Sequence, residues 1–304
     1  MRALVTGSTG FLGSHLVRTL IDSGDRVAVL LRPESTPWRI RDCLDELRVL
    51  RAESPVARST IGDVHDFRPE VIYHLAWAGS HGGSRNDPGQ LHTNLTETAA
   101  VLGLAAATQC SALIGVGSQA EYGACADVLQ ESTPLRPQSA YGVAKLAAGV
   151  SLCSIGPVLG IRCAWLRLLS AYGPMDDPTY VIPYMITQLL GQRSPRLTSA
   201  TQWHDTLFCA DVAEALRAAA ASDRCRGAYV LASGAATTLR EVAETVRALI
   251  GPDAPAISYG PASGHPGWRG SAARLSDDAG WKARTPLAAG LAETIDWYRN
   301  HADS

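Results

Sequence analysis

The sequence predicts an α/β protein with a doubly wound parallel sheet and a smaller C-terminal lobe. Short apolar runs of strand length alternate with longer segments whose apolar residues recur at helical spacing, which indicates a parallel sheet covered on both faces. The 304 residues suffice for one large domain with a smaller lobe. After residue 172 the pattern loosens into segments interrupted by Pro and Gly. We therefore expect the sheet domain over residues 1–172, with later returns to the sheet near 203–233, and the lobe mainly over 173–304.

The individual elements follow from the length and spacing of the apolar runs. Strands are predicted for Ala3–Thr6, Val27–Leu31, Leu47–Arg51, Val71–Ala76, Ala112–Val116 and Cys163–Leu168, with a late strand at Ala228–Ala232. Helical spacing is found in Gly13–Ser23, Asp87–Ala107 and Ser139–Leu159.

The third strand has two alternatives. A strand near Asp63 would leave too few residues before Val71 for the crossover that parallel strands need. With the strand at Leu47–Arg51, the segment Pro55–Phe67 can form the crossover helix, and Pro55 suits a helix start. We prefer this second assignment.

Composition excludes several classes of protein. The chain is 46% hydrophobic and 18% charged, which is typical of globular proteins and unlike disordered or fibrous chains. The chain has 27 Lys and Arg residues and 29 Asp and Glu residues, which gives a formal net charge of −2. No segment of the sequence concentrates charges of one sign. We therefore expect neither nucleic acid nor a membrane surface as a partner.

The cysteines, the N-terminal residues and the most apolar stretch of the chain lead us to expect a cytoplasmic protein. The 7 cysteines are scattered without a Cys-x-x-Cys pair, so we expect reduced core residues and no metal. The chain opens directly on a strand-like run, which leaves no room for a signal peptide. Polar residues interrupt its most apolar stretch, Ala99–Gly117, which we interpret as a helix end followed by a strand.

A glycine-rich turn joins the first strand to the first helix. Gly7 permits a tight turn, Gly10 lets the backbone approach a pyrophosphate at the helix N-terminus, and Gly13 allows close packing of helix on strand. This position in the chain supports a Rossmann-type dinucleotide site over a ligand-free turn. The expected contacts come from Gly7, Ser8, Thr9, Gly10, Phe11 and Leu12.

The residue after the second strand bears on the choice of dinucleotide. Arg32 suits a ribose 2′-phosphate, where an acidic residue would bind a 2′-hydroxyl. Ser35 could add a hydroxyl to the same phosphate. We therefore favour NADP over NAD, the alternative being a solvated surface arginine. Glu53 is expected to meet the adenine amino group, with Asp63 as second choice.

A tyrosine and a lysine four residues apart share one helical face. The ammonium of Lys145 would favour the phenolate of Tyr141 and so make it usable as a proton donor or acceptor near neutral pH. Ser118, at the end of the fifth strand, can hydrogen-bond a substrate carbonyl. Together with the glycine turn, these residues predict carbonyl chemistry with a nicotinamide cofactor.

At this point the chain resembles the extended short-chain dehydrogenase/reductase family, in its NAD(P)-dependent epimerase/dehydratase group that acts on nucleotide sugars. His74-Leu-Ala-Trp77 is similar to the family's His-Leu-Ala-Ala segment, which implies Leu75, Ala76 and Trp77 at the cofactor. Asn94 matches the family Asn that supports the proton-relay helix near the cofactor. The stretch Arg167–Pro174 resembles Arg-x-x-Asn-x-Tyr-Gly-Pro beside nicotinamide and sugar, which implies contacts from Leu168 and from Ser170, where Asn is usual.

The C-terminal half carries further similarities. Trp203-His-Asp205 through Asp211-Val212 resembles the family's Arg-Asp-Phe…Asp-Val segment, with His204 in place of the usual Arg. Gly280-Trp281, Gly290-Leu291 and Trp297-Tyr298 resemble the family's ending, and we interpret these aromatic residues as packing.

The resemblance narrows the reaction. Related 4,6-dehydratases carry Thr-Asp-Glu where this chain has Ser118-Gln119-Ala120, and Gln and Ala lack the acid–base capacity for dehydration. The preferred hypothesis is NADPH-dependent reduction of the 4-keto group of a nucleotide-linked 4-keto-6-deoxyhexose, with a dTDP-linked sugar preferred. An NAD-dependent nucleotide-sugar epimerase, a reductase of another ketone and a non-catalytic NADP-binding sensor or scaffold remain as alternatives.

Substrate contacts and assembly complete the predictions. The loop Ser80–Asn86, with Ser80 and His81 as candidate contacts, follows the fourth strand at the sheet's carboxyl edge, where ligands bind, and is otherwise a surface loop. The other candidate substrate contacts are Gln119, Ala120, Ser170, His204 and Arg269, the last as a bidentate partner of a pyrophosphate or else a surface residue. The helices near 87–107 and 139–159 are Ala- and Leu-rich, and in the resembled family such helices form a dimer interface, so we expect a homodimer.

Overall fold

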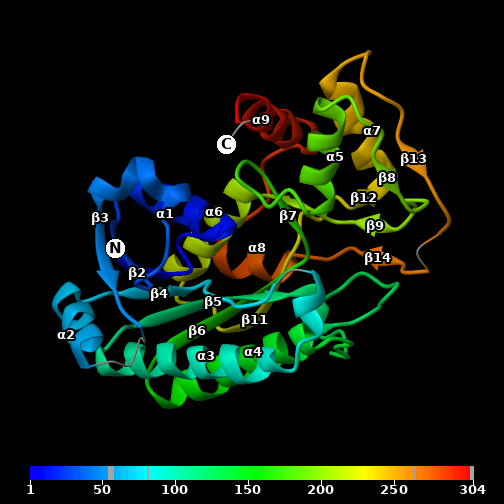
Figure 1. The fold of residues 1–304 in the computed structure, drawn as a ribbon. Helices are drawn as coiled ribbons and strands as arrows, with labels where there is room; N and C mark the ends of the chain where they lie inside the picture. The colour runs from blue at the N-terminus through cyan, green and yellow to red at the C-terminus, as the bar shows by residue number, and fades with distance from the viewer. Residues whose placement is uncertain (54–57, 81, 263, 302–304) are drawn as a thin grey trace.

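A computed structural model describes residues 1–53, 58–80, 82–262 and 264–301. Its centre is a seven-stranded sheet in the order β3-β2-β1-β4-β5-β6-β11, with every neighbouring pair parallel (Figure 1). The strands are β1 (Arg2–Thr6), β2 (Arg26–Leu31), β3 (Leu47–Arg51), β4 (Val71–His74), β5 (Ala112–Ser118), β6 (Arg162–Leu168) and β11 (Gly227–Leu231). The strand order reverses between β1 and β4, the point at which doubly wound sheets bind ligands.

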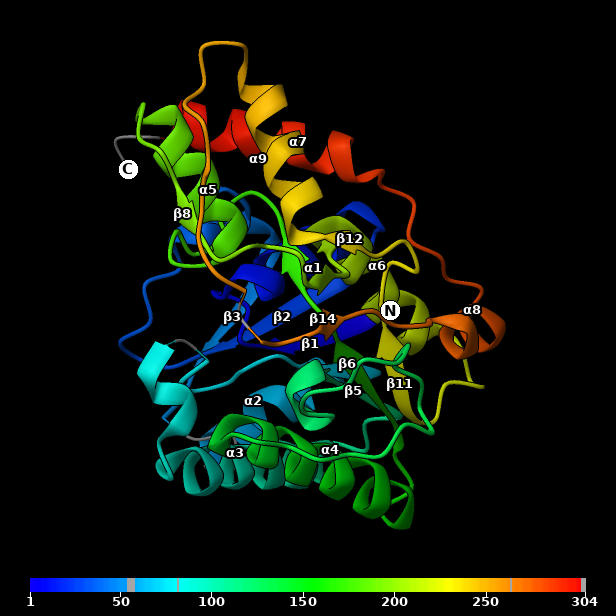
Figure 2. The ribbon, with the colours of Figure 1, turned by 90° about the vertical axis from the view of Figure 1, so that its right-hand side faces the viewer.

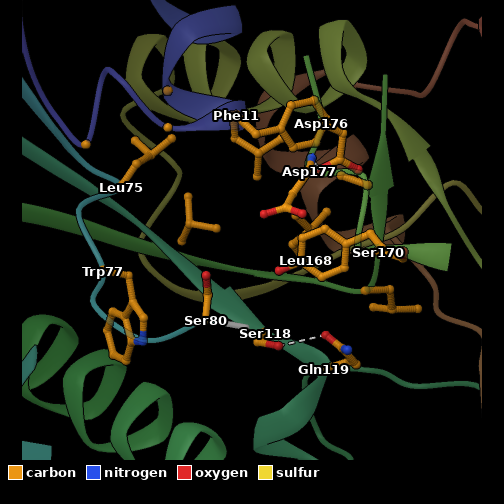
Figure 3. A pocket seen from close by; sticks show the side chains of 18 of the residues that line it. Phe11, Leu75, Trp77, Ser80, Ser118, Gln119, Leu168, Ser170, Asp176 and Asp177 are labelled. Atoms are coloured by element: carbon orange, nitrogen blue, oxygen red, sulfur yellow. Dashed lines mark hydrogen bonds between the residues drawn. The ribbon is translucent and has the colours of Figure 1, made fainter. Parts of the chain in front are cut away.

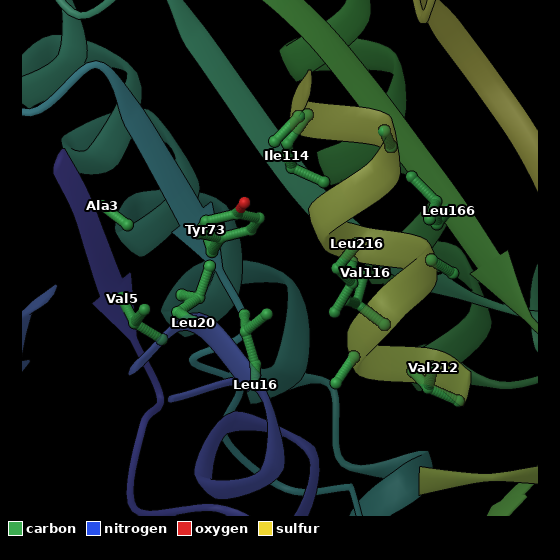
Figure 4. Close-up of a cluster of buried hydrophobic side chains, with 14 of the residues drawn as sticks. Ala3, Val5, Leu16, Leu20, Tyr73, Ile114, Val116, Leu166, Val212 and Leu216 are labelled. Atoms are coloured by element: carbon green, nitrogen blue, oxygen red, sulfur yellow. The ribbon is translucent and has the colours of Figure 1, made fainter. Parts of the chain in front are cut away.

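Helices cover both faces of this sheet. One face carries α1 (Phe11–Asp22), α6 (Cys209–Ala221) and α8 (Ala273–Ala279), and the other α2 (Arg58–Phe67), α3 (Gly89–Ala107) and α4 (Ala140–Val158). Because side chains alternate along a strand, Ala3 and Val5 of β1 pack beneath α1 while Leu4 faces the opposite layer. Figure 4 shows the first of these cores, with Leu16 and Leu20 of α1 and Leu216 of α6 on the sheet.

The sequence predictions for the sheet are confirmed, with shifts at a few ends. The third strand is Leu47–Arg51 as preferred, and the late strand is β11. The fourth strand ends at His74, earlier than predicted, so Leu75 and Ala76 belong to the loop after it. The crossover helix α2 is present over Arg58–Phe67, whereas Pro55 lies outside the described residues.

A second group of helices lies beyond the carboxyl edge of the sheet (Figure 2). It consists of α5 (Val181–Leu190), α7 (Leu239–Ile250) and α9 (Leu287–Asn300), whose apolar faces share one core. This half of the chain also contains two short two-stranded sheets and one three-stranded sheet. The two-stranded sheets are β7 (Ala171–Tyr172) with β10 (Leu207–Phe208), and β8 (Arg196–Leu197) with β13 (Ser258–Tyr259). The three-stranded sheet is β9 (Trp203–His204) between β12 (Thr237–Thr238) and β14 (Gly267–Trp268). Since α6, β11 and α8 come from the same half of the chain but pack on the main sheet, the lobe is interleaved with the sheet domain. The predicted boundary at residue 172 stays a prediction.

Helix α4 is the one described helix that is long and apolar enough to cross a membrane. Its inner face packs Ala148 and Leu152 on the sheet beside α3. The predicted split of Ala99–Gly117 into a helix end and a strand is confirmed by α3 and β5. In the described part of the chain all cysteines are unpaired, and no three His, Cys, Asp or Glu side chains gather as metal ligands.

Candidate active site

The turn between β1 and α1 is shaped by its glycines. Gly7 has φ of +72°, and a Cβ there would lie 2.4 Å from the backbone nitrogen of Ala76. A Cβ on Gly13 would lie 2.1 Å from the carbonyl oxygen of Gly7, so helix and turn touch through their backbones. Among the described residues no side chain caps the start of α1 at Gly10, which leaves its first N–H groups for an anion.

Two adjoining cavities open at this edge of the sheet, of about 240 and 490 Å³, and share Gly7, Gly10, Leu75 and Trp77. The smaller one brings together further predicted cofactor residues: Ser8, Thr9, Arg32, Ser35, Glu53, Ala76 and Asn94. The larger one brings together Phe11, Leu12, Ser80, Ser118, Gln119, Tyr141, Lys145, Leu168, Ser170 and His204. The buried Ser8 hydroxyl has no hydrogen-bond partner among the described residues, so it is available to donate to a phosphate oxygen.

Two predicted substrate residues lie elsewhere, and a third cannot be placed. Ala120 and Arg269 line neither cavity, and the Arg269 guanidinium instead lies 5.0 Å from the ring centre of Trp203. Arg269 Nε is buried without a partner in the described structure. His81 lies outside the described residues.

Arg32 occupies the mouth of the smaller cavity. Its side chain is 70% exposed, and its Nε lies 3.5 Å from Glu34 Oε1. Such an exposed pair is weak, so a phosphate could displace it. Arg51 Nη1 donates to the carbonyl oxygens of Arg32 (3.3 Å) and Pro33 (2.8 Å), which fixes the loop that carries Arg32. Asp63, the second choice for the adenine contact, lies on α2 and lines neither cavity.

The loop after β4 is held by buried polar groups. Asn94 accepts a hydrogen bond from the Ala78 nitrogen (2.8 Å) and donates one to the Ala78 oxygen (3.1 Å). His74 lies 3.0 Å from Thr6 Oγ1, and burial lowers the pKa of His74 to about 3. A neutral His74 and Asn94 thus fix the loop that carries Trp77.

Tyr141 and Lys145 face the larger cavity from the first turns of α4, whose start is capped by Ser139. Lys145 Nζ donates to the Val116 oxygen (2.8 Å) and lies 3.6 Å from the ring centre of Trp77. Burial lowers the pKa of Lys145 to about 7, against a smaller opposing effect of the Glu121 charge.

The phenol differs from the sequence-based expectation. Burial raises the pKa of Tyr141 to about 12, while a hydrogen bond with Ser118 and the charge of Arg85 act in the opposite direction. The expected influence of Lys145 is weak here because its Nζ lies 5.9 Å from the Tyr141 ring centre and is turned towards Val116.

Ser118 is fixed by a buried carboxylate that the sequence analysis missed. Glu121 Oε1 accepts hydrogen bonds from the Ser118 nitrogen (2.9 Å) and from Trp165 Nε1 (2.9 Å). Its Oε2 forms an ion pair with Arg167 Nε at 2.8 Å, and Glu121 is fully buried. Glu three residues after Ser is the spacing of a helix capping box, a signal that could have identified Glu121.

Gln119 lies directly beside Ser118, their side-chain polar atoms 2.7 Å apart (Figure 3). The amide orientation that satisfies its surroundings lets the Gln119 nitrogen donate to the oxygens of Leu168 (3.1 Å) and Leu169 (2.9 Å). Gln119 therefore ties the end of β5 to the segment after β6.

His204 contributes a neutral imidazole to the larger cavity. Burial lowers its pKa to about 4, and its Nε2 has no partner among the described residues. An imidazole in this state can hydrogen-bond a ligand but carries no charge with which to bind a phosphate.

Several cavity residues were not anticipated. Figure 3 shows Asp176 and Asp177 beside Phe11, at the end of the cavity opposite Ser118. Burial raises the pKa of Asp176 to about 7. The others are Arg39, which donates to the Thr9 oxygen (3.2 Å), and Tyr180, whereas Arg85 belongs to the predicted loop Ser80–Asn86. Asp176, Asp177 and Tyr180 precede α5, and Arg39 lies in the short helix η1 (Trp38–Glu46). No recognisable spacing marks them, so only tertiary contacts identify them.

Comparisons with known proteins agree with this architecture. A model of the NAD dependent epimerase/dehydratase family matches residues 3–232. The chain is 27% identical to a UDP-glucose 4-epimerase of Mycolicibacterium smegmatis, over 99% of both chains. It is 26% identical to a dTDP-glucose 4,6-dehydratase of Streptomyces griseus, over 98% of this chain and 94% of that one.

A solved structure gives the same picture. The UDP-glucose 4-epimerase of Thermus thermophilus, in complex with NAD, superposes with a TM-score of 0.85 at 27% identity, over 99% of this chain and 100% of that one. The family match extends from β1 to the end of β11 and includes the glycine turn, Ser118, Tyr141 and Lys145. This chain therefore belongs to the NAD dependent epimerase/dehydratase family.

Proposed function

We propose that this protein is an NADPH-dependent oxidoreductase that reduces the 4-keto group of a nucleotide-linked 4-keto-6-deoxyhexose, with a dTDP-linked sugar as the first substrate to test. The observation that carries the proposal is the cavity that Tyr141 and Ser118 line together beside the non-acidic Gln119. A hydroxyl and a phenol together can bind a carbonyl oxygen and protonate it.

The two cavities fit a nicotinamide dinucleotide. The uncapped N-terminus of α1 and the unpartnered Ser8 hydroxyl suit its pyrophosphate, with Arg32 and Glu53 at the adenosine end. Lys145 and Tyr141 line the cavity at the other end, where a ribose and nicotinamide would bind. When bound in reduced form, the cofactor supplies a hydride.

The side chains supply the proton and the orientation. Ser118 and Tyr141 both hydrogen-bond the carbonyl oxygen, and Tyr141 gives up its proton as the oxygen gains negative charge. Glu121 keeps Ser118 in place through its backbone nitrogen. Elimination of water would need a second acid or base beside Ser118, which Gln119 and Ala120 cannot provide.

An NAD-dependent nucleotide-sugar epimerase is the competing function. It is favoured by the epimerase relative that matches 99% of this chain and by the Thermus structure in complex with NAD. The two functions differ in turnover of the cofactor, because an epimerase returns the hydride to the sugar whereas a reductase consumes it. A sensor or scaffold that only binds NADP would do neither.

The reaction can be tested with NADPH and a panel of dTDP-, UDP-, CDP- and GDP-4-keto-6-deoxyhexoses, followed by absorbance of the reduced nicotinamide. We expect oxidation of NADPH with a 4-hydroxy sugar as product. Tyr141→Phe should lower the rate by about 10²–10⁴-fold, because it removes the general acid. Inversion of a non-keto sugar nucleotide without net use of NADPH would establish the epimerase instead.

Cofactor preference tests the role of Arg32 separately. We expect NADPH to bind about ten- to a hundredfold more tightly than NADH, because a charge-assisted hydrogen bond contributes about 1.5–3 kcal/mol. Arg32→Asp should reverse this order in calorimetric titrations. Equal affinities in the unmodified protein would contradict the assignment to NADP.

A homodimer is proposed from the outer face of α4. Val150, Ile155 and Val158 are 54%, 47% and 85% exposed there, next to α3. Pairing of α3 and α4 with those of a second copy would cover these side chains. Light scattering should give about twice the 32.2 kDa of one chain, and a monomer at micromolar concentration would refute the dimer.

A further inference from the structure

Arg85 stacks on the phenol of Tyr141. It comes from the short helix η2 (Gly82–Asn86), and its guanidinium carbon lies 4.3 Å from the centre of the Tyr141 ring. The edge of Trp77 meets the same tyrosine at a centroid distance of 6.0 Å. The Arg85 side chain lines the larger cavity.

No hydrogen bond or ion pair to another described residue occupies this guanidinium. By contrast, the two buried arginines of β6 have polar partners: Arg167 pairs with Glu121, and Arg162 donates to carbonyl oxygens such as that of Ala219 (3.0 Å). The contact of Arg85 with the Tyr141 ring is therefore its principal fixed interaction in the described structure.

Lys145 does not take this position. Its Nζ lies 5.9 Å from the Tyr141 ring, donates to the Val116 oxygen and sits over Trp77. Burial also brings the pKa of Lys145 to about 7, so its charge is partly lost near neutral pH. A guanidinium keeps its charge throughout this range.

We propose that Arg85, which lies on η2, is a positioning residue that orients the Tyr141 ring of α4 and favours its phenolate form. The inference rests on the proposed role of Tyr141 as proton donor. A cation against one face of the ring restricts its rotation and stabilises negative charge on its oxygen.

The other polar groups around Tyr141 come from several different elements. Ser118, from β5, hydrogen-bonds the phenol, whereas Lys145 lies on α4 itself and Glu121 belongs to the short helix η3 (Gln119–Glu121). Tyr180 approaches from the start of α5. Of these, Glu121 and Tyr180 disfavour the phenolate, and Arg85 is the cation that opposes them.

The consequence depends on the direction of the reaction. When Tyr141 acts as a base it must be ionised, so an alcohol O–H proton passes to the phenolate while hydride leaves carbon for the oxidised nicotinamide. When it acts as an acid, its O–H bond breaks and the proton passes to the carbonyl oxygen as hydride arrives. Loss of Arg85 should slow the first direction about tenfold at pH 8 and the second much less.

The experiment compares Arg85→Leu, Arg85→Lys and Arg48→Leu, the last a matched loss of an exposed arginine on β3. Tyrosine labelled with ¹³C at Cζ reports the ionised fraction of the phenol by NMR with NADP⁺ bound as the pH is raised towards 12, and Tyr141→Phe identifies the resonance. We expect Arg85→Leu to raise the titration midpoint of Tyr141 by about one pH unit. Arg85→Lys should restore most of it and Arg48→Leu should leave it unchanged.

Two outcomes would overturn the proposal: an unchanged midpoint in Arg85→Leu, or failure of Arg85→Lys to restore it. The NMR measurement needs no turnover, so it is separable from the reaction. If no 4-keto sugar supported oxidation of NADPH, the proposed function would fail while the Arg85 shift could still be measured.

Discussion

The two cavities are built in different ways. The smaller one is formed largely by backbone, at the turn around Gly7, and by exposed loop residues such as Arg32. The larger one encloses ionisable groups from both halves of the chain, among them the partly buried Tyr141 and the buried Lys145 and Asp176. A phosphate-binding turn therefore requires only a short local sequence pattern. A reactive centre requires charged groups whose neighbours come from distant parts of the chain.

The largest effect is expected from the buried ion pair behind Ser118. Glu121→Gln leaves Arg167 buried without a counter-charge, which should lower the free energy of unfolding by about 3–5 kcal/mol in urea titrations. Adding Arg167→Met should recover part of this loss, because the unpaired charge disappears.

The chain offers a matched control for this prediction. Glu241 forms the same capping box with Thr238 at the start of α7, but in an exposed position. Glu241→Gln should leave the free energy of unfolding nearly unchanged. Equal losses in the two Gln variants would show that the capping box, and not the buried charge, matters.

A smaller effect should follow from breaking the backbone cradle. Gly13→Ala places a methyl group 2.1 Å from the Gly7 oxygen, and overpacking of this kind costs about 1–3 kcal/mol. Because the strain falls on the phosphate-binding turn, we expect NADPH affinity, measured by calorimetry, to drop about ten- to a hundredfold.

Gly62→Ala on α2 is the control for the cradle, because a Cβ there has nothing within 4 Å. It should stabilise the protein slightly, since Ala is the better helix former by up to about 1 kcal/mol. Undiminished cofactor affinity in Gly13→Ala would mean that the turn can relax and that the two cavities differ less than proposed.

The smallest expected effect concerns Asp176, whose pKa burial raises from 3.8 to about 7. Between these values the unfolded chain loses the proton that the folded protein retains, so this carboxyl destabilises the fold increasingly as pH rises. Asp176→Asn should therefore raise the free energy of unfolding at pH 8, by on the order of 1–2 kcal/mol. Most of the gain should be lost near pH 3.5, where the folded state is protonated and the unfolded state is mostly so.

Asp253→Asn, in an exposed turn, provides the comparison for the pH series. It should give the same small change at both pH values. A gain for Asp176→Asn that does not depend on pH would indicate a packing effect and would remove Asp176 from the buried charges of the larger cavity.

More of the residues that line the smaller cavity than of those that line the larger one could be predicted from the sequence. The glycine turn, Arg32 and Glu53 follow strands whose ends can be located from apolar runs, and the structure brings them together. Tyr141, Lys145 and Ser118 were also found, because helical spacing and the end of β5 placed them.

The rest depended on contacts between distant segments. Asp176 lies in a connecting segment whose course is set by tertiary packing, so no periodicity marks it. The raised pKa of Tyr141 arises from the burial that results when the loop after β4 and the lobe close around it. Arg269 was misplaced relative to the cavity lining because the path of the segment around β14 cannot be inferred from its composition.

The proposed reduction is tested most directly by isotope transfer. NADPH carrying deuterium at both C4 positions of its nicotinamide would be incubated with the protein and a dTDP-4-keto-6-deoxyhexose, and the sugar examined by NMR and mass spectrometry. We expect one deuterium at C4 of a 4-hydroxy product for every NADPH oxidised, and none with Tyr141→Phe. A sugar that changes configuration without deuterium and without loss of NADPH would contradict it.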